Sequence, residues 1–389
     1  MTLPVLTPWS AGRIAGRARR LAELVTTPLL PADYLDLFSP LRTGADLRGR
    51  ILQVRSETRD AVTLVIRPGR GWRGHQPGQY VRIGVDVDGV RNWRAYSLTS
   101  PTWQTPATWR TSASQTSDAW RTSARSGTSV EDGIISITVK AIPGGKVSQH
   151  LVRHATPGMM IMLDQAAGDF TLPPERPAKV LFLTAGSGIT PVMGMLRNAI
   201  DSLDDVVVLH SAPCAAEVIF GAALRALAAR GAIRLIERHT DTDGKVTMDD
   251  LAAMVPDWAQ RQTWACGPTG LLDDAEKHWG GTGVADLLHT ERFRPTVLAT
   301  GEGGTVTFAR SKITLECDGT TPLLDAGEEA GALMPSGCRM GICFGCVVPL
   351  REGAVRDLRN GEITTAVPEE PVLIQTCVSA AAGTCDLDL

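Results

Sequence analysis

Hydrophobic residues follow two different periods along the chain, and each period predicts a different architecture. From about Leu47 to Pro174, apolar and β-branched residues alternate with polar ones in short stretches that Gly, Pro and Asp interrupt. Alternation with period two and frequent turn residues predict the antiparallel strands of a β-barrel. The predicted strand-rich stretches are Ile51–Ile66, Gln79–Val87, Trp93–Leu98, Ile134–Lys140 and Met159–Leu163.

A second pattern begins at about Arg176 and continues to Pro295. Short apolar runs, which are typical of buried parallel strands, cover Val180–Thr184, Val206–His210, Ile233–Glu237 and Thr263–Cys266. Apolar residues at helical spacing cover Glu217–Ala229, Met248–Met254 and Leu271–Trp279. Alternating strands and helices predict an α/β doubly wound sheet, which binds its ligand at the carboxyl ends of the strands.

Residues 1–45 form an N-terminal extension. Between Ser10 and Val25, apolar residues recur at helical spacing beside a stripe that contains Arg13, Arg17 and Arg20. Two interpretations stay open. The helix packs on the next domain, or residues 13–25 form a basic amphipathic helix in peripheral contact with an anionic membrane.

A biased segment interrupts the predicted barrel at residues 101–129. It is rich in Thr, Ser, Ala and Trp, and the sequence Trp-Arg-Thr-Ser-Ala occurs at both 109–113 and 120–124. Such a composition does not supply a packed face. We therefore expect a low-complexity loop inserted between two barrel strands, and the sequence does not assign it a role.

The length of the chain limits the number of domains, and its net charge limits the kinds of partner. The 389 residues suit two or three domains, which we place at 46–175, 176–295 and 305–389. The net charge of −3 argues against nucleic acid as a partner. No signal-peptide pattern or apolar run of membrane-spanning length is present. We therefore expect a cytoplasmic protein, apart from any peripheral contact at the inner face of the membrane.

Four of the eight cysteines have the spacing of an iron–sulfur site. Cys338, Cys343 and Cys346 follow the pattern C-x4-C-x2-C, and Cys377 follows thirty residues later. This is the ligand spacing of a plant-type [2Fe–2S] ferredoxin, in which four thiolates hold two irons. A zinc ribbon would require two C-x2-C pairs, and only one is present. The sequence therefore predicts a one-electron carrier.

The barrel segment carries a second set of motifs. Arg94-Ala95-Tyr96-Ser97 follows Pro77-Gly78-Gln79-Tyr80, and Gly144-Gly145-Lys146-Val147-Ser148 opens a predicted helix. Together with the α/β segment that follows, these motifs resemble the flavin-binding domain of the ferredoxin–NADP reductase family. The resemblance implies that Tyr96 packs on the flavin ring, Ser97 hydrogen-bonds near its reactive nitrogen and Arg94 meets phosphate. Backbone N–H groups of Gly145, Val147 and Ser148 would bind a pyrophosphate, which implies FAD.

The first strand of the α/β segment ends in Gly186-Ser187-Gly188-Ile189-Thr190, a turn whose glycines admit a pyrophosphate. A later strand ends in Cys266-Gly267-Pro268. Both motifs match the reductase family, in which they hold the nicotinamide nucleotide and the cysteine lies near the hydride-donating carbon. By the same resemblance, Glu291 and Phe293 set an acid and an aromatic ring beside the flavin. A cysteine without this context would be inert core.

Flavin, nucleotide and ferredoxin domains in this order resemble the reductase components of multicomponent oxygenases. The segment Leu24–Phe38 further resembles actinobacterial reductases that supply membrane fatty-acyl desaturases. The resemblance implies a β-grasp-like α+β ferredoxin domain. This domain contains twelve acidic and six basic residues, which suits either a basic partner or a solvated surface.

The electron count then predicts the reaction. A nicotinamide gives two electrons, a [2Fe–2S] cluster accepts one, and a flavin can exchange either number. We expect an NAD(P)H oxidoreductase that feeds a separate di-iron oxygenase, such as a membrane desaturase or alkane hydroxylase. A soluble ring-hydroxylating dioxygenase or epoxidase is the alternative acceptor. A non-catalytic [2Fe–2S] redox sensor is the alternative of another class.

The choice between NADPH and NADH stays open from the residues alone. Ala212-Pro213-Cys214, which follows the second predicted strand of the α/β segment, lacks an arginine suited to a 2′-phosphate. Arg238, after a later strand, is a candidate. The family resemblance favours NADPH.

Overall fold

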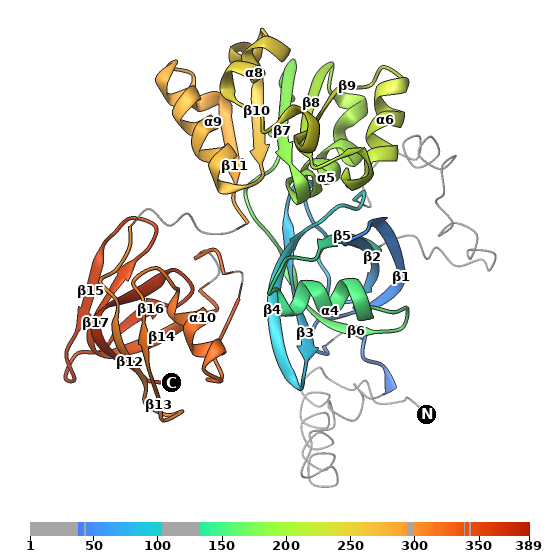
Figure 1. The fold of residues 1–389 in the computed structure, drawn as a ribbon. Helices are drawn as coiled ribbons and strands as arrows, with labels where there is room; N and C mark the ends of the chain where they lie inside the picture. Colours follow the sequence, from blue (N-terminus) through green and yellow to red (C-terminus); the bar gives the residue numbers. More distant parts are fainter. Residues whose placement is uncertain (1–37, 43, 103–132, 294–298, 338, 342–343) are drawn as a thin grey trace, which may run out of the picture.

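The computed structural model describes residues 38–42, 44–102, 133–293, 299–337, 339–341 and 344–389. The predicted N-terminal helix and most of the biased insert lie outside the described residues. Three separate sheets organise the described part of the chain (Figure 1). We call the units built on them the barrel domain, the central domain and the C-terminal domain.

The barrel domain contains six antiparallel strands in the order β4-β3-β6-β1-β2-β5. An isolated bridge between Leu98 and Ile137 joins the end of β4 to β5 and closes the sheet. The predicted stretch Ile51–Ile66 is a hairpin, because Arg59 and Asp60 turn the chain between two strands. The elements are β1 (Arg48–Thr58), β2 (Ala61–Pro68), β3 (Tyr80–Val87), β4 (Val90–Ser97), β5 (Ile135–Lys140), α4 (Lys146–His154) and β6 (Met160–Ala167).

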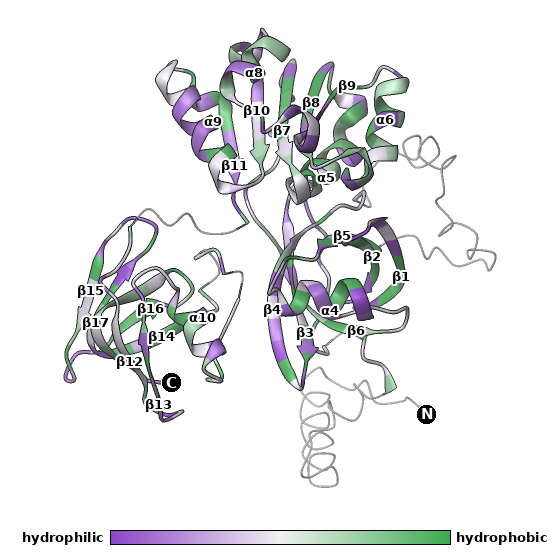
Figure 2. Cartoon of the chain, in the orientation of Figure 1, coloured by the Kyte–Doolittle hydropathy of each residue, from purple (hydrophilic) through white to green (hydrophobic). Residues whose placement is uncertain are grey.

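The central domain has five parallel strands in the order β11-β10-β7-β8-β9, so the predicted doubly wound sheet is confirmed. The strands are β7 (Lys179–Ala185), β8 (Asp205–Ala212), β9 (Arg234–His239), β10 (Gln262–Cys266) and β11 (Leu288–Glu291). The helices are α5 (Ile189–Ala199), α6 (Gly221–Ala229), α7 (Thr240–Asp243), α8 (Met248–Met254) and α9 (Thr269–Gly281). Figure 2 shows apolar strands in this sheet and a hydrophilic face on α9.

One predicted helix starts later than expected. The helical pattern suggested a start at Glu217, but Glu217 ends a short 3-10 turn and α6 begins at Gly221. Phe220, with a φ of 59°, adopts the left-handed conformation between the two. The apolar residues of this connection are buried in the core of the central domain. The helical spacing of these apolar residues therefore results from their burial and does not mark a continuous helix.

The C-terminal domain has the expected α+β architecture. Its sheet has the order β13-β12-β17-β14-β15, and β16 pairs with β14. The elements are β12 (Gly304–Phe308), β13 (Ile313–Cys317), α10 (Leu323–Glu329), β14 (Val347–Asp357), β15 (Ile363–Ala366), β16 (Val372–Gln375) and β17 (Ser379–Leu387). In the described part of the chain, no helix has the length and apolar character needed to cross a membrane.

Helix α5 joins the central domain to the barrel. A Cβ atom at Gly194 would lie 2.3 Å from the Leu98 carbonyl oxygen, so only a glycine permits this contact. Farther along α5, Arg197 Nη1 donates to the Thr99 carbonyl at 2.7 Å, and Asn198 Nδ2 donates to the Ser100 carbonyl at 3.2 Å. The segment that follows β4 is therefore fixed against the helix that follows β7.

We predict that Gly194→Ala destabilises the protein by about 1–3 kcal/mol, the usual cost of overpacking a tight contact. Unfolding in urea, followed by tryptophan fluorescence, measures this change. Gly280→Ala is the matched control, because Gly280 is exposed on α9 and a Cβ there meets nothing within 4 Å. That control should leave stability equal or slightly raised, because alanine favours a helix over glycine. Equal stability of both variants would show that the α5–barrel contact is loose.

Candidate functional site

The end of β4 presents two residues of the predicted flavin motif. Tyr96 lies opposite Val81 and packs against the barrel core, and burial raises the pKa of its phenol. Ser97 is buried, and its Oγ has no hydrogen-bond partner among the described residues. A buried hydroxyl without a partner costs free energy. The site therefore fits a bound group, such as a flavin ring, that completes this hydrogen bond.

Arg94, two residues before Tyr96, lies between two domains. Its Nη1 donates to the Trp93 carbonyl at 2.8 Å. Burial lowers the pKa of its guanidinium, and the positive charge of Arg339 in the C-terminal domain lowers it further. The carboxylates of Glu328 and Asp325 on α10 act in the opposite direction. The predicted phosphate-binding arginine is thus close to the predicted cluster loop.

The predicted pyrophosphate seat is the N-terminus of α4. No side chain caps this helix, and its first turn contains no acid. Its first N–H groups lack partners within the helix, which suits an anion. The Ser148 hydroxyl donates to the Gly145 carbonyl at 3.2 Å and accepts from the Ile142 amide at 3.3 Å. The hydroxyl therefore holds the turn together. The Gly145 N–H donates to the Ile142 carbonyl at 3.1 Å, and pyrophosphate binding by the amides of Val147 and Ser148 stays a prediction.

The turn after β7 packs against the end of β10. Gly186 adopts a φ of +55° with open space beside it. A Cβ at Gly188 would lie 2.0 Å from the carbonyl oxygen of Cys266, so the two predicted nucleotide motifs are in direct backbone contact. Thr190 Oγ1 donates to the Ser187 carbonyl at 2.9 Å and fixes the turn. The carboxyl ends of β7 and β10 lie where the strand order reverses, which is the usual ligand position in such sheets.

Cys266 and Glu291 are the last residues of the neighbouring strands β10 and β11. They are paired in register on β10 and β11, next to Gly267 and Pro268. Burial raises the pKa of the Cys266 thiol. Burial also raises the pKa of Glu291 to about 8, and its Oε2 has no hydrogen-bond partner among the described residues. The site therefore contains a neutral thiol and a carboxyl that stays largely protonated near neutral pH.

Two further candidate residues, one predicted to lie beside the flavin and one for the nucleotide, lie farther out. Phe293, two residues beyond Glu291, is 37% exposed and is available to cover a bound ring. Arg238 lies opposite Ser211 in the sheet, and it donates to the carbonyls of Asp243 and Gly244. Its role toward a 2′-phosphate stays a prediction, since binding would require it to leave these partners.

Two predicted cluster ligands converge in the C-terminal domain. Cys346 and Cys377 are buried beside Leu324 and Val378, with their sulfur atoms 3.2 Å apart and not disulfide-bonded. Cys338 and Cys343 lie outside the described residues. Accordingly, no group of three or more potential metal ligands is found in the part of the chain that is described. The two converging thiols fit two of the four positions of a [2Fe–2S] site.

Side chains that the sequence motifs did not single out hold the cluster loop. Arg359 Nη1 and Gln375 Nε2 donate to the Gly341 carbonyl at 3.1 and 2.9 Å. The Thr376 hydroxyl donates to the Cys346 carbonyl at 2.9 Å. Arg359 lies in the connection between β14 and β15, whereas Gln375 ends β16 and Thr376 directly precedes Cys377. Only the folded arrangement identifies them.

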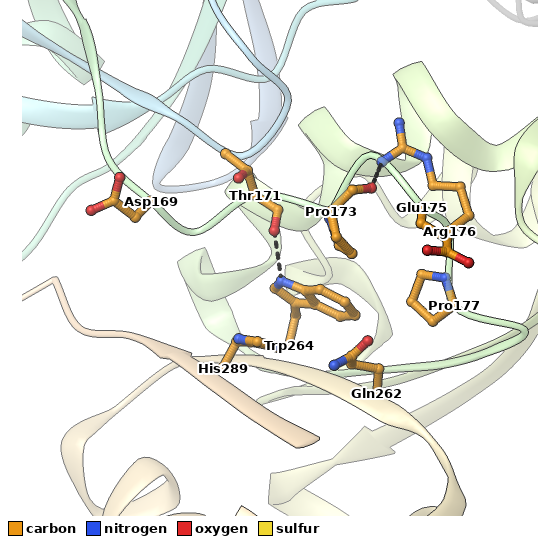
Figure 3. Close-up of a pocket in the computed structure, with 9 residues that line it drawn as sticks. All are labelled: Asp169, Thr171, Pro173, Glu175, Arg176, Pro177, Gln262, Trp264 and His289. Carbon is orange, nitrogen blue, oxygen red and sulfur yellow. Dashed lines mark hydrogen bonds between the residues drawn. The ribbon is translucent and has the colours of Figure 1, made fainter. Parts of the chain in front are cut away.

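A separate cavity of about 540 Å³ lies beside the sheet rather than at its carboxyl edge (Figure 3). It is bounded by the connection from the barrel domain and by Gln262, Trp264 and His289. Trp264 stacks on His289 with ring centroids 4.7 Å apart, and its Nε1 donates to the Thr171 carbonyl at 3.2 Å. This cavity contains none of the predicted site residues.

The comparisons with known proteins agree with this site. A family model described as 2Fe-2S iron-sulfur cluster binding domain matches residues 306–382. The chain is 50% identical to an NADPH oxidoreductase of Mycobacterium tuberculosis, over 95% of this chain and 92% of that protein. It is 29% identical to the ferredoxin reductase component of 3-ketosteroid-9-alpha-monooxygenase of Mycolicibacterium smegmatis, over 84% of this chain and 92% of that protein.

The fold is also shared with a solved structure. Phthalate dioxygenase reductase superposes with a TM-score of 0.55 at 21% identity and covers 88% of this chain and 97% of its own. That likeness concerns the fold alone, whereas the extensive match to the mycobacterial oxidoreductase concerns the sequence. The chain belongs to the ferredoxin reductase family of NAD(P)H-dependent flavoproteins, in the branch that carries a C-terminal [2Fe–2S] domain.

Proposed function

We propose that this protein takes electrons from NADPH and delivers them singly to a separate oxygenase. When bound, FAD supplies the exchange between two-electron and one-electron chemistry, and the [2Fe–2S] cluster supplies the one-electron exit. The observation that carries the proposal is that the predicted flavin motif lies close to both the predicted cluster loop and the helix that follows the predicted nucleotide turn. Arg94 lies near Arg339 of the cluster loop, while α5 contacts the segment that directly follows Ser97.

The residues of the chain have distinct parts in this proposal. Tyr96 and Ser97 would hold the flavin ring, and the start of α4 would bind its pyrophosphate. The turn at Gly186–Gly188 would bind the nucleotide pyrophosphate, so that the nicotinamide reaches the ring above Cys266. The uncharged state of the buried Cys266 thiol suits a contact with a neutral ring. Glu291, whose pKa is raised by burial to about 8, would keep a proton within the site.

The acceptor is the finer part of the proposal. We infer an oxygen-activating di-iron enzyme of the membrane, such as a fatty-acyl desaturase or alkane hydroxylase. The support is the segment Leu24–Phe38, which resembles reductases of that kind, and the basic stripe in residues 13–25. A soluble ring-hydroxylating oxygenase is the second candidate, supported by the monooxygenase component among the relatives.

We predict that Cys377→Ser abolishes the [2Fe–2S] absorbance and the reduction of protein acceptors. Reduction of ferricyanide by NADPH, which flavin alone supports, should remain within about twofold, because the barrel and the cluster domain have separate cores. Cys385→Ser is the matched control, since Cys385 is buried in the same domain and burial raises the pKa of its thiol to about 12. Loss of ferricyanide reduction together with the cluster would contradict this electron order.

We predict that Ser97→Ala lowers FAD affinity while leaving the stability of the FAD-free protein equal or higher. The Ser97 hydroxyl is buried without a partner in the described structure, so removing it costs nothing until the flavin is bound. The expected loss in affinity is about fivefold to tenfold, or roughly 1 kcal/mol for one neutral hydrogen bond. Isothermal titration with FAD and thermal unfolding of the FAD-free protein measure the two effects. Equal FAD affinity would exclude this hydroxyl as a flavin ligand.

The acceptor itself can be distinguished by anaerobic transfer. The protein, reduced with NADPH, is mixed with a membrane desaturase in vesicles that contain anionic lipid, or with a soluble oxygenase. The full-length protein should reduce the membrane enzyme faster than a variant that lacks residues 1–25, and salt should weaken this advantage because it screens charges. Equal rates for both proteins, or transfer to the soluble oxygenase alone, would overturn the membrane acceptor.

A further inference from the structure

The contact between the cluster loop and the barrel is centred on one arginine that no motif contains. Arg82 lies on β3, and its side chain is only 20% exposed. A Cβ atom at Gly345 would lie 3.3 Å from Nη1 and 3.4 Å from Nη2 of Arg82. Gly345 directly precedes the predicted ligand Cys346. The guanidinium of the barrel domain therefore lies against the backbone of the cluster loop.

The barrel domain fixes this guanidinium from two sides. Its Nε forms an ion pair with the Asp164 carboxylate at 3.1 Å. Its Cζ lies 5.3 Å from the centroid of the Trp93 ring, a cation–π distance. The Trp93 ring in turn lies over Gly84, where a Cβ would come within 3.0 Å of it. The four groups therefore lie in a row, with the Trp93 ring and the Arg82 guanidinium between Gly84 and Gly345. The two glycines, which have no side chain, leave room for this row.

A second contact points to the same arrangement. Arg339, in the described part of the cluster loop, forms ion pairs with Asp325 and Glu328 of α10. These three charged groups act on Arg94 of the barrel, as described above. Figure 1 shows α10 on the side of the C-terminal domain that faces β3 and β4. Two arginines of the β3–β4 hairpin thus face the cluster loop and the adjoining helix.

Charged groups rather than apolar side chains line the contact between these two domains. Among the described residues, each apolar core cluster of the C-terminal domain contains residues of that domain alone. The apolar core of the barrel likewise contains only barrel residues, and no strand of one sheet pairs with a strand of the other. A contact of this kind is reversible and weakens as salt rises.

We propose that Arg82 is a positioning residue that docks the cluster loop on the barrel and brings the cluster next to the flavin site. This proposal rests on the proposed function, because docking matters only if electrons pass between the flavin site and the cluster. Release of the contact would free the cluster domain to meet the acceptor. Arg82 belongs to none of the predicted cofactor-binding motifs, and its proposed effect is on the distance between the two sites.

The test compares Arg82→Gln with Arg82→Lys and Arg91→Gln in the full-length protein with both cofactors. Arg91 is the matched control, because it lies on the same hairpin, forms an ion pair with Asp86 at 2.8 Å and is exposed. Small-angle X-ray scattering at low and high salt measures the separation of the domains. Anaerobic rapid mixing with NADPH then measures flavin reduction and cluster reduction as separate absorbance phases.

We expect Arg82→Gln to give, at low salt, the expanded scattering profile that the unchanged protein gives only at high salt. Its cluster phase should slow by about tenfold, because the cluster is no longer held next to the flavin site, while its flavin phase stays unchanged. Arg82→Lys should restore part of both effects, and Arg91→Gln should show neither. An unchanged flavin phase also shows that the variant is folded.

Two results would overturn the proposal, and they differ from a failure of the proposed function. If Arg82→Gln keeps the compact profile and the cluster rate of the unchanged protein, Arg82 does not dock the loop. If Arg91→Gln has the same effect as Arg82→Gln, the effect belongs to the charge of the hairpin and not to this contact. If the unchanged protein itself fails to reduce its cluster with NADPH, the proposed function fails first.

Discussion

The site depends on the close backbone contacts of helix α5. At its start, Gly188 lies against the Cys266 carbonyl, and in its middle, Gly194 lies against the Leu98 carbonyl. A side chain larger than hydrogen at either position would separate β7 from β10 or the central domain from the barrel. Because both contacts are made by backbone, they are short and rigid. The turn after β7 and the end of β4 are consequently held at a fixed distance.

The C-terminal domain is attached by a different kind of interaction. Charged side chains line its described contact with the barrel, because Arg82 lies against Gly345 and Arg94 lies near Arg339, Asp325 and Glu328. This contrast suits the two transfers that the protein must support. Hydride transfer requires two rings in contact, which a rigid joint favours, whereas delivery to a separate protein requires an exit that can become accessible.

Sequence patterns predicted much of this arrangement, and the reasons for the failures are physical. Period-two alternation predicted the barrel, short apolar runs predicted the parallel sheet, and cysteine spacing predicted the cluster domain that the family model also matches. The start of α6 was wrong because buried residues before it have helical spacing without a helix. Arg82 and Arg359 were missed because their partners are distant in sequence. The inward hydroxyl of Ser148 was missed because a motif specifies a residue type and not its rotamer.

The central claim is that electrons enter at the flavin site and leave through the cluster. Anaerobic rapid mixing with less than one equivalent of NADPH tests it most directly, followed at flavin and cluster absorbance bands. The account predicts that flavin absorbance falls first, at a rate that rises with NADPH concentration. Cluster absorbance should then fall at a rate independent of NADPH, as the flavin absorbance recovers. Cluster reduction that precedes flavin reduction, or that occurs in protein depleted of FAD, would contradict the account.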